Sequence, residues 1–250
     1  MIKEILNRGV TIHPRKDSSL NATKEILGAQ FVIPASKPLC TLKGRNLSFP
    51  FALAEPFFLL KPQDKNTVDA LCTYAPRLRE LAVNEKTGLM DGHYSQRIIL
   101  PQGDQMLQVF NLLRKDPLSR RAVVTIHNPV WDRVDGDSKD ICCTCNLHFM
   151  IRGGKLHCFC HMRSNDLWLG TVHNANMFTF LQRALAGWLG IKPGLYAHTA
   201  NSLHMYENHL EKARNLLRAP ETFDMLNTIA FPQHSSPEFT YAAAETFIAW

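Results

Sequence analysis

The sequence lacks several features that would place it in a common protein class. It has no run of about 18 apolar residues, so no membrane-spanning helix is expected. Its first residues, MIKEILNRGVTIHPRKD, contain no apolar core of signal-peptide length. Repeats and low-complexity segments are absent, and 45% hydrophobic residues with a net charge of only +6 exclude global disorder. We therefore expect a cytoplasmic chain that forms a single domain over residues 1–250.

The motifs of several large enzyme classes are also missing. Neither G-x-x-x-x-G-K-[ST] nor G-x-G-x-x-G occurs, which excludes the two common phosphate-binding loops, and G-x-S-x-G and H-E-x-x-H are absent. The isoelectric point near 9.0 still permits phosphate-bearing partners such as nucleotides, anionic cofactors or nucleic acid. Because the arginines cluster in motifs rather than along one stripe, a nucleic-acid-binding protein is the weaker interpretation.

The spacing of apolar residues predicts a chain that mixes helices and strands. Strands are expected at residues 25–33, 121–127, 145–151, 156–161, 195–198 and 238–241. Helices are expected at residues 50–60, 68–83 with an interruption at Pro76, 102–114, 174–189 and 202–217. The fold class that follows is α+β, with a mixed or antiparallel sheet and several helices.

Five of the seven cysteines lie close together in the sequence, which suggests either a metal site or a reactive thiol. They are Cys142, Cys143, Cys145, Cys158 and Cys160. Structural zinc sites usually use C-x2-4-C turns, whereas these residues flank a predicted hairpin that turns at Gly153-Gly154. We therefore predict no metal site and keep a structural zinc protein as the weaker alternative. The cysteines are either small buried hydrophobic residues or, in one case, a nucleophile.

Three segments carry residue types suited to chemistry on a phosphorylated substrate. Ser119-Arg120-Arg121 places two arginines, which bind phosphate with two hydrogen bonds each, just before a predicted strand, although a solvated turn is the common alternative. The segment 140–145, Asp-Ile-Cys-Cys-Thr-Cys, offers a thiol that nearby cations would activate. The segment 162–174, Met-Arg-Ser-Asn-Asp-Leu-Trp-Leu-Gly-Thr-Val-His-Asn, follows the hairpin.

The third segment combines several kinds of polar group. Arg163 and Ser164 suit another phosphate contact, and the amide of Asn174 can both donate to and accept from a pyrimidine edge. Asp166 would serve either in the site or simply as a helix N-cap.

The order of these segments resembles the thymidylate synthases and the related pyrimidine-nucleotide hydroxymethylases. The shared motifs are S-R-R before a strand, a cysteine about ten residues before G-K-L, R-S-x-D-x-x-L-G-x-x-x-N and H-x-Y-x-N-H. The resemblance is densest from residue 119 to about 212 and weaker near residues 55 and 91–94. It implies a thymidylate-synthase-like α+β fold, in which a mixed β-sheet has flanking helices and packs against its copy in a homodimer.

The resemblance also implies a role for each matching residue. Cys143 matches the nucleophile that attacks C6 of the pyrimidine, which makes Cys142 and Cys145 bystanders. Glu55 and Tyr94 match residues that move protons near C4 and C5. The remaining matches contact the substrate or the cofactor, 5,10-methylenetetrahydrofolate: Arg163 and Ser164 at the 5′-phosphate, Arg120 and Arg121 at the partner's phosphate across the dimer, Asn174 at N3 and O4, His204 and Tyr206 at the sugar, and Asp166 and Gly170 at the folate. Asp166 also matches a catalytic residue that contacts the ordered waters around the base.

Several positions depart from the synthase pattern. The arginine of the N-terminal phosphate loop is missing near Ser18, with Arg15 or Lys16 as substitutes, and no tryptophan lies between residues 55 and 94. Thr144 follows the nucleophile where synthases typically have His, and the end, Glu-Thr-Phe-Ile-Ala-Trp250, does not match the tail that closes a synthase site. These losses affect folate binding and water exclusion, which hydride transfer requires.

We therefore expect 5-hydroxymethylation, with a divergent thymidylate synthase that methylates dUMP as the alternative. Asn174 favours dUMP over dCMP, because deoxycytidylate hydroxymethylases typically carry Asp at that position. The neighbouring His173 and Asn176 leave cytosine or ribose substrates such as CMP open. A catalytically inactive interaction protein on this fold is disfavoured because Glu55 and Cys143 are both present.

Overall fold

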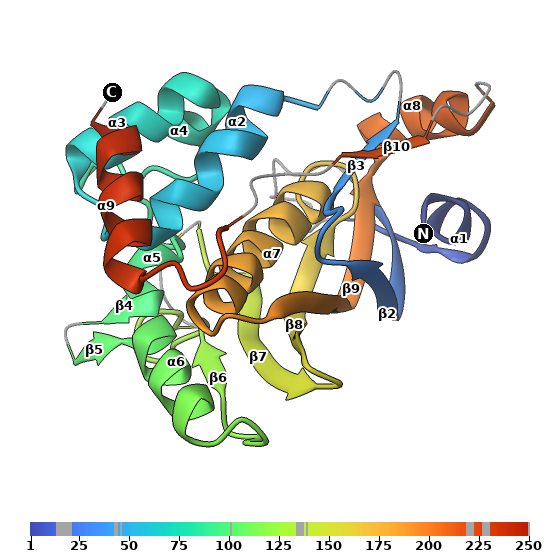
Figure 1. The fold of residues 1–250 in the computed structure, drawn as a ribbon. Helices are drawn as coiled ribbons and strands as arrows, with labels where there is room; N and C mark the ends of the chain where they lie inside the picture. The colour runs from blue at the N-terminus through green and yellow to red at the C-terminus, as the bar shows by residue number, and fades with distance from the viewer. Residues whose placement is uncertain are drawn as a thin grey trace.

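The fold is built around a twisted mixed sheet, as the computed structural model shows (Figure 1). The structure describes residues 1–13, 22–42, 45, 47–100, 102–133, 138, 140–218, 223–226 and 231–249. Within these residues the main sheet has the strand order β1-β2-β9-β8-β7-β6. The strands are β1 (Val10–Ile12), β2 (Thr23–Pro34), β6 (Val123–Thr125), β7 (Thr144–Arg152), β8 (Lys155–Asp166) and β9 (Lys192–Tyr206).

One parallel pair makes this sheet mixed. Strands β8 and β9 run parallel, and the other neighbouring strands run antiparallel. The β7–β8 hairpin turns at Gly153 and Gly154, whose φ angles of +55° and +68° suit a tight turn that glycine enters without strain. The predicted mixed sheet with flanking helices is therefore confirmed.

Helix α7 (Thr171–Trp188) covers one face of the sheet and forms the centre of the core (Figure 1). Nearly all of its side chains from Ala175 onward are buried, against alternate residues of β7 and β8 such as Phe149, Leu156 and Cys158. This alternation follows from the two-residue period of a strand, which turns every second side chain toward the helix. Helix α7 begins shortly after β8 ends, so its first turn lies at the carboxyl end of that strand, where the candidate site is located.

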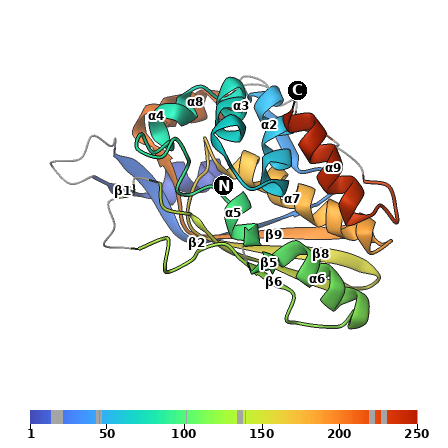
Figure 2. The same cartoon turned by 90° about the vertical axis from the view of Figure 1, so that its left-hand side faces the viewer.

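The other helices lie around this layer. Figure 2 shows α2, α3 and α9 on the same side of the sheet as α7. The helical segments are α1 (Ile2–Arg8), α2 (Phe49–Ala54), the 3-10 helix η1 (Glu55–Leu60), α3 (Lys65–Tyr74), α4 (Arg77–Leu81), α5 (Ser95–Ile98), α6 (Gln105–Lys115), α8 (Glu207–Arg218) and α9 (Pro237–Ile248). Two small sheets pair β3 (Leu39–Leu42) with β10 (Phe223–Leu226) and β4 (Ile99–Leu100) with β5 (Gly103–Asp104). None of the described helices is long and apolar enough to cross a membrane.

Two predicted elements are wrong. The helix expected at residues 202–217 begins only at Glu207, because residues 202–206 extend β9, where all of them pair with β2 and residues 202–204 also pair with β8. The strand expected at 238–241 lies inside α9, where the Ser236 hydroxyl caps the first turn by accepting from the Phe239 amide. Long-range pairing decides the first case and a local cap decides the second.

Candidate active site

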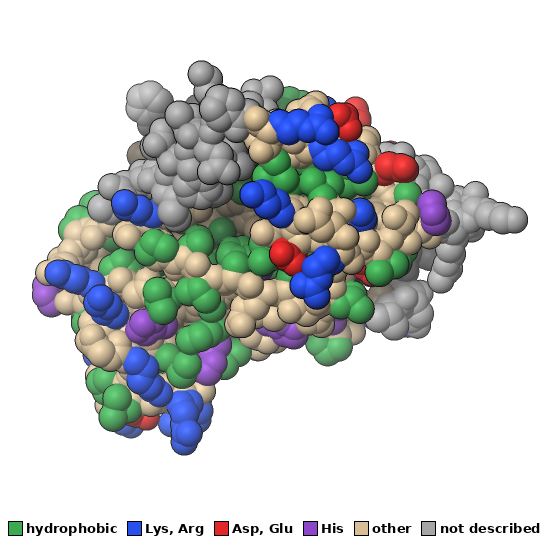
Figure 3. Space-filling view, turned by 90° about the vertical axis from the view of Figure 1, so that its right-hand side faces the viewer, with side chains coloured by type: hydrophobic (Ala, Val, Ile, Leu, Met, Phe, Trp, Pro, Cys, Tyr) green, Lys and Arg blue, Asp and Glu red, His purple; other side chains and the backbone are tan. Residues whose placement is uncertain are grey.

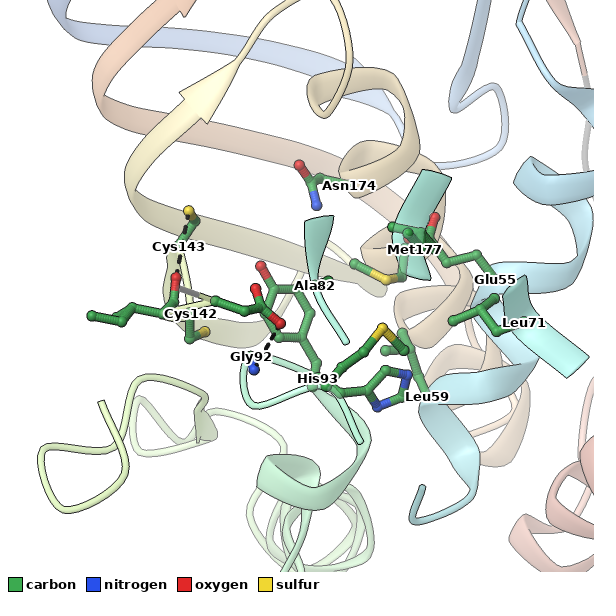
Figure 4. Close-up of a pocket in the computed structure, with 15 residues that line it drawn as sticks. Glu55, Leu59, Leu71, Ala82, Gly92, His93, Cys142, Cys143, Asn174 and Met177 are labelled. Carbon is green, nitrogen blue, oxygen red and sulfur yellow. Dashed lines mark hydrogen bonds between the residues drawn. The ribbon is translucent and has the colours of Figure 1, made fainter. Parts of the chain in front are cut away.

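One cavity brings together side chains from four distant parts of the chain. Glu55 from η1, Tyr94 before α5, Cys143 before β7 and Asn174 from α7 line a hollow of about 260 Å³. Figure 4 shows that Glu55, Cys143 and Asn174 lie around this cavity on three separate parts of the chain. The four residues to which the sequence assigns roles in one reaction therefore line the same cavity. The remaining wall is largely apolar, with Leu59, Leu71 and Met177 among its residues.

Two adjacent thiols line this cavity, and they differ in accessibility. Cys142 is 2% exposed, its thiol donates to the Thr144 carbonyl at 3.1 Å, and burial raises its pKa to about 12. Cys143 is partly exposed; burial raises its pKa too, but the Arg163 guanidinium acts in the opposite direction. The resting Cys143 is therefore a thiol that additional positive charge would help to ionise.

A buried ion pair positions the segment that carries these cysteines. The Arg97 guanidinium donates to both carboxylate oxygens of Asp132, at 2.5 and 2.9 Å, and the two side chains are 2% and 1% exposed. Asp132 also accepts from the backbone amides of Cys142 and Asn128. Sequence reasoning missed this pair, because 35 residues separate its members and neither belongs to a motif.

Glu55 and Tyr94 are both held in their uncharged forms. Burial raises the pKa of the Glu55 carboxyl to about 8, and burial also raises the pKa of Tyr94 well above its usual value. The Thr144 hydroxyl donates to the Tyr94 hydroxyl at 3.0 Å, so the residue after Cys143 contacts the phenol directly. A carboxyl whose pKa lies near neutrality is suited to both giving and taking a proton.

The amide of Asn174 has a fixed orientation. Its Oδ1 accepts from the Asn165 side-chain amide at 2.8 Å, and Asn165 Oδ1 in turn accepts from the Thr171 hydroxyl at 2.6 Å. The Nδ2 group of Asn174 is thereby left as a donor. Gly170 permits this packing, because a Cβ there would lie 3.2 Å from both the Asn165 and the Asn174 side chains.

Asp166 combines a structural contact with an unused oxygen. Its Oδ1 accepts from the amides of Trp168 and Leu169 in the turn before α7, whereas the N-cap of α7 is Gly170, so the alternative role of Asp166 as a helix N-cap is wrong. Its buried Oδ2 has no hydrogen-bond partner within the described residues. Such an atom is costly unless a ligand satisfies it, so Asp166 is suited to accept from a bound molecule.

The predicted sugar and phosphate residues lie beside this carboxylate. In the β8–β9 ladder Asp166 pairs with His204, and Tyr206 is close enough that Asp166 and Cys143 contribute to its raised pKa, after burial. Ser164 pairs with Ser202 in the same ladder. Structure and sequence therefore agree that the R-S-x-D and H-x-Y motifs meet.

The predicted arginines occupy two places. Arg163 is near Cys143 and donates to the carbonyl oxygens of Ile141 and Cys142. Arg120 and Arg121 lie exposed just before β6 and do not line the cavity. The positions of Ser18, Arg15, Lys16 and Trp250 lie outside the described residues.

A second cavity, of about 390 Å³, lies beside the first. His173 lines the second cavity and the next residue, Asn174, lines the first. Its wall combines cationic with aromatic side chains: Arg45, Arg77, Phe51, Tyr74, Trp168 and His173. The Arg45 guanidinium lies 5.6 Å from the centre of the Trp168 ring and donates to the Trp168 carbonyl. Sequence reasoning missed this cavity, since its residues come from three separate segments, at 45–51, 74–77 and 168–173. A flat anionic ligand would fit such a wall.

No described group of three or more His, Cys, Asp or Glu residues is arranged to hold a metal ion. This statement includes the five clustered cysteines, of which Cys158 and Cys160 are buried with pKa values raised by burial.

The comparisons with known proteins agree with this geometry. The family model described as thymidylate synthase matches residues 1–245. A deoxyuridylate hydroxymethyltransferase of Bacillus phage SP01 is 32% identical over 175 residues, which are 66% of this chain but only 45% of that relative. The fold is similar to the thermostable thymidylate synthase A from Bacillus subtilis, with a TM-score of 0.72, 23% identity, and 88% and 82% of the two chains covered.

Proposed function

This chain belongs to the thymidylate synthase family, and we propose that it transfers a one-carbon unit to C5 of dUMP and releases a 5-hydroxymethyl product. One observation carries the proposal: Cys143, Glu55, Tyr94 and Asn174 surround the same cavity. A thiol, a nearly neutral carboxyl and an amide are the groups needed to attack, protonate and orient a pyrimidine.

Cys143 is the proposed nucleophile. The C5 carbon of a pyrimidine is a poor nucleophile until a thiolate adds to C6, which turns C5 into an enolate carbon. Arg163 favours the thiolate, and Ser164 beside it would bind the 5′-phosphate. Glu55 and Tyr94 would move protons near C4 and C5, and His204 and Tyr206 would contact the sugar.

The orientation of Asn174 supports uracil as the base. Because its Oδ1 already accepts from Asn165, its free Nδ2 can donate to the O4 carbonyl of uracil, whereas cytosine offers an amino group there. The side chains of Asn165 and Thr171 would have to rearrange before the Asn174 amide could flip and exchange the positions of its oxygen and nitrogen. We therefore place dUMP before dCMP and CMP.

The residues present fit 5,10-methylenetetrahydrofolate. When bound, this cofactor supplies a one-carbon unit at the oxidation level of formaldehyde. Asp166 Oδ2 is the unsatisfied acceptor that a pterin N–H would meet, and Gly170 leaves room beside it. Arg45, Arg77 and the aromatic rings of the second cavity would hold the flat, anionic remainder of the molecule.

Addition of water to an exocyclic methylene on C5 would give the hydroxymethyl product. The water oxygen forms a bond to the methylene carbon, the C=C electron pair moves to the C4 oxygen, and a base takes the proton. The pair then returns to re-form the C5–C6 double bond as the Cys143 thiolate leaves, so nothing is oxidised or reduced. The phage relative, the absence of tryptophan between residues 55 and 94, and Thr144 in place of His support this outcome over methylation.

A product assay tests the proposal. The protein is incubated with methylenetetrahydrofolate and each of dUMP, dCMP, UMP and CMP, and the products are analysed by mass spectrometry. We expect dUMP to gain CH2O, with tetrahydrofolate as the second product. A gain of CH2 with dihydrofolate would replace hydroxymethylation by methylation. Failure to release the C5 hydrogen from any of the four nucleotides would overturn the enzymatic proposal.

Asn174→Asp is expected to change the preferred base from dUMP to dCMP. A protonated carboxyl at this position can donate to N3 of cytosine while it accepts from the amino group, and it no longer matches uracil. The ratio of kcat/KM for dUMP to that for dCMP should fall by about 100-fold or more, which corresponds to about 3 kcal/mol. An unchanged ratio would show that Asn174 does not face the base.

We also infer a homodimer formed through the face of the sheet opposite α7. Strand register places Val123, His148, Phe159, Ala197 and Val32 in one row across that face. Val32 and Phe159 are 53% and 39% exposed there, so the row presents apolar side chains to solvent, as an interaction surface does. Figure 3 shows hydrophobic and histidine side chains side by side on the face that it draws. Packing of two such faces would bring Arg120 and Arg121 toward the partner's phosphate.

A further inference from the structure

His173 and Glu55 meet at the boundary between the two cavities. Glu55 lines the cavity that contains Cys143, and His173 lines the cationic, aromatic cavity beside it. The His173 Nδ1 atom lies 3.8 Å from Glu55 Oε2, and the two side chains are 14% and 21% exposed. Phe51 packs against the imidazole with ring centres 4.9 Å apart, which holds the ring beside the carboxyl.

Both atoms of this contact lack another partner. Glu55 Oε2 and His173 Nδ1 are buried and have no hydrogen-bond partner within the described residues. Their separation exceeds hydrogen-bond length by about 1 Å, a gap that a small side-chain rotation closes. Buried polar atoms are normally satisfied, so two unsatisfied atoms facing each other indicate a contact that is made during the reaction.

We propose that His173 is the proton partner of Glu55, so that the two side chains share one proton and Glu55 becomes a carboxylate without releasing that proton to solvent. In the resting pair the carboxyl is protonated and the imidazole is neutral. When Glu55 passes its proton to Nδ1, the O–H bond breaks and an N–H bond forms, which leaves a carboxylate facing the pyrimidine and an imidazolium facing the second cavity. The proposal rests on the role of Glu55 as a base in the proposed function.

The electrostatics of the surroundings favour a resting pair in which both side chains are uncharged. Burial lowers the pKa of His173 to about 4, with a smaller contribution from Arg45, and burial raises that of Glu55 to about 8. Between these values the pair holds one proton. The other titratable or charged groups that line the two cavities are Arg45, Arg77 and Tyr74 around His173, and His93, Tyr94, Asp140, Cys142 and Cys143 around Glu55.

The test compares the pH dependence of C5-hydrogen release in the wild type with that in His173→Phe and His173→Gln. Wild-type release should be nearly independent of pH between about 5 and 8, because the shared proton count is constant there. In either variant the carboxylate forms only by loss of a proton to solvent. With a Glu55 pKa of about 8, the rate of each variant should then rise about tenfold for each pH unit between about pH 5 and 8, whereas the wild-type rate stays nearly level.

Other results would overturn the relay. A decrease by the same factor at every pH would indicate a purely structural role for the ring. Wild-type behaviour of His173→Gln would show that hydrogen bonding without proton transfer is sufficient. Because C5-hydrogen release precedes product formation, this assay gives its answer whether the product is hydroxymethyl or methyl.

A measurement on the protein alone separates the two proposals further. The ¹⁵N spectrum of labelled histidine, assigned with His173→Phe, should show a neutral His173 imidazole at pH 6. A cationic His173 at that pH would contradict the relay even if the product assay succeeded. A neutral His173 would support the relay even if the preferred base proved not to be uracil.

Discussion

Cys143→Ala is expected to lower product formation by on the order of 10⁴-fold or more, because the thiol that forms the bond to C6 is removed. The variant should still fold, since Cys143 is only partly buried and the one hydrogen bond of its thiol to a described residue is a long one, of 3.9 Å, to the Ile141 carbonyl. The measurement is a single-turnover assay with dUMP and methylenetetrahydrofolate. A covalent adduct with the nucleotide, detected by intact-protein mass spectrometry, should disappear at the same time.

The neighbouring cysteines supply matched controls. Cys142 donates to the Thr144 carbonyl and is 2% exposed, so Cys142→Ala should cost stability rather than chemistry. Cys145 lies on β7 and does not line the cavity, so Cys145→Ala should retain most of the activity. Loss of the adduct in Cys145→Ala with its retention in Cys143→Ala would show that the nucleophile has been misassigned.

Asp132→Asn is expected to destabilise the protein by about 3–5 kcal/mol, because it leaves the buried Arg97 guanidinium without its paired carboxylate. The cost includes the weakened hydrogen bonds to the amides of Cys142 and Asn128. Equilibrium urea unfolding measures the change. Because Asp132 holds the segment that leads to Cys143, turnover should fall as well, even at temperatures where the variant remains folded.

A double replacement distinguishes two effects of Asp132: its compensation of the buried charge, which affects stability, and its positioning of the loop, which affects turnover. Arg97→Met with Asp132→Leu removes both charges together and should recover much of the lost stability, since buried ion pairs are often replaceable by apolar side chains. It should not restore turnover, because the backbone amides of Cys142 and Asn128 still lack their acceptor. Equal loss of stability in the single and the double variant would mean that hydrogen bonding, not the buried charge, dominates.

Local patterns predicted the elements nearest to the site with good accuracy. The alternation in β7 and β8 and the Gly153-Gly154 turn specify a hairpin, and the long apolar run after Gly170 specifies α7. These features depend on neighbours in the sequence, such as strand alternation, turn geometry and helix periodicity. The local pattern of residues 202–206 predicts a helix, because it does not reveal their pairing with β2 or the pairing of residues 202–204 with β8.

The site likewise contains residues that sequence motifs identify and residues that only the structure reveals. Motifs with internal spacing, R-S-x-D and H-x-Y, identified Arg163, Asp166, His204 and Tyr206, and the structure places these residues on adjacent strands. The ion pair between Arg97 and Asp132 has no such signal. The same holds for the second cavity, whose wall brings Arg45 and Arg77 beside Trp168.

The residue types and their order were sufficient to indicate the family, an α+β fold with a long apolar helix, and the set of groups available for chemistry. These properties follow from short-range periodicity and from motifs whose members lie within a few residues of each other. The protonation states and partners of those groups depend instead on the folded chain. Glu55 holds its proton near neutrality because η1 buries it, and it faces His173 because α7 begins beside η1. Burial and contact between segments more than a hundred residues apart arise only when the chain folds, so no local pattern could contain them.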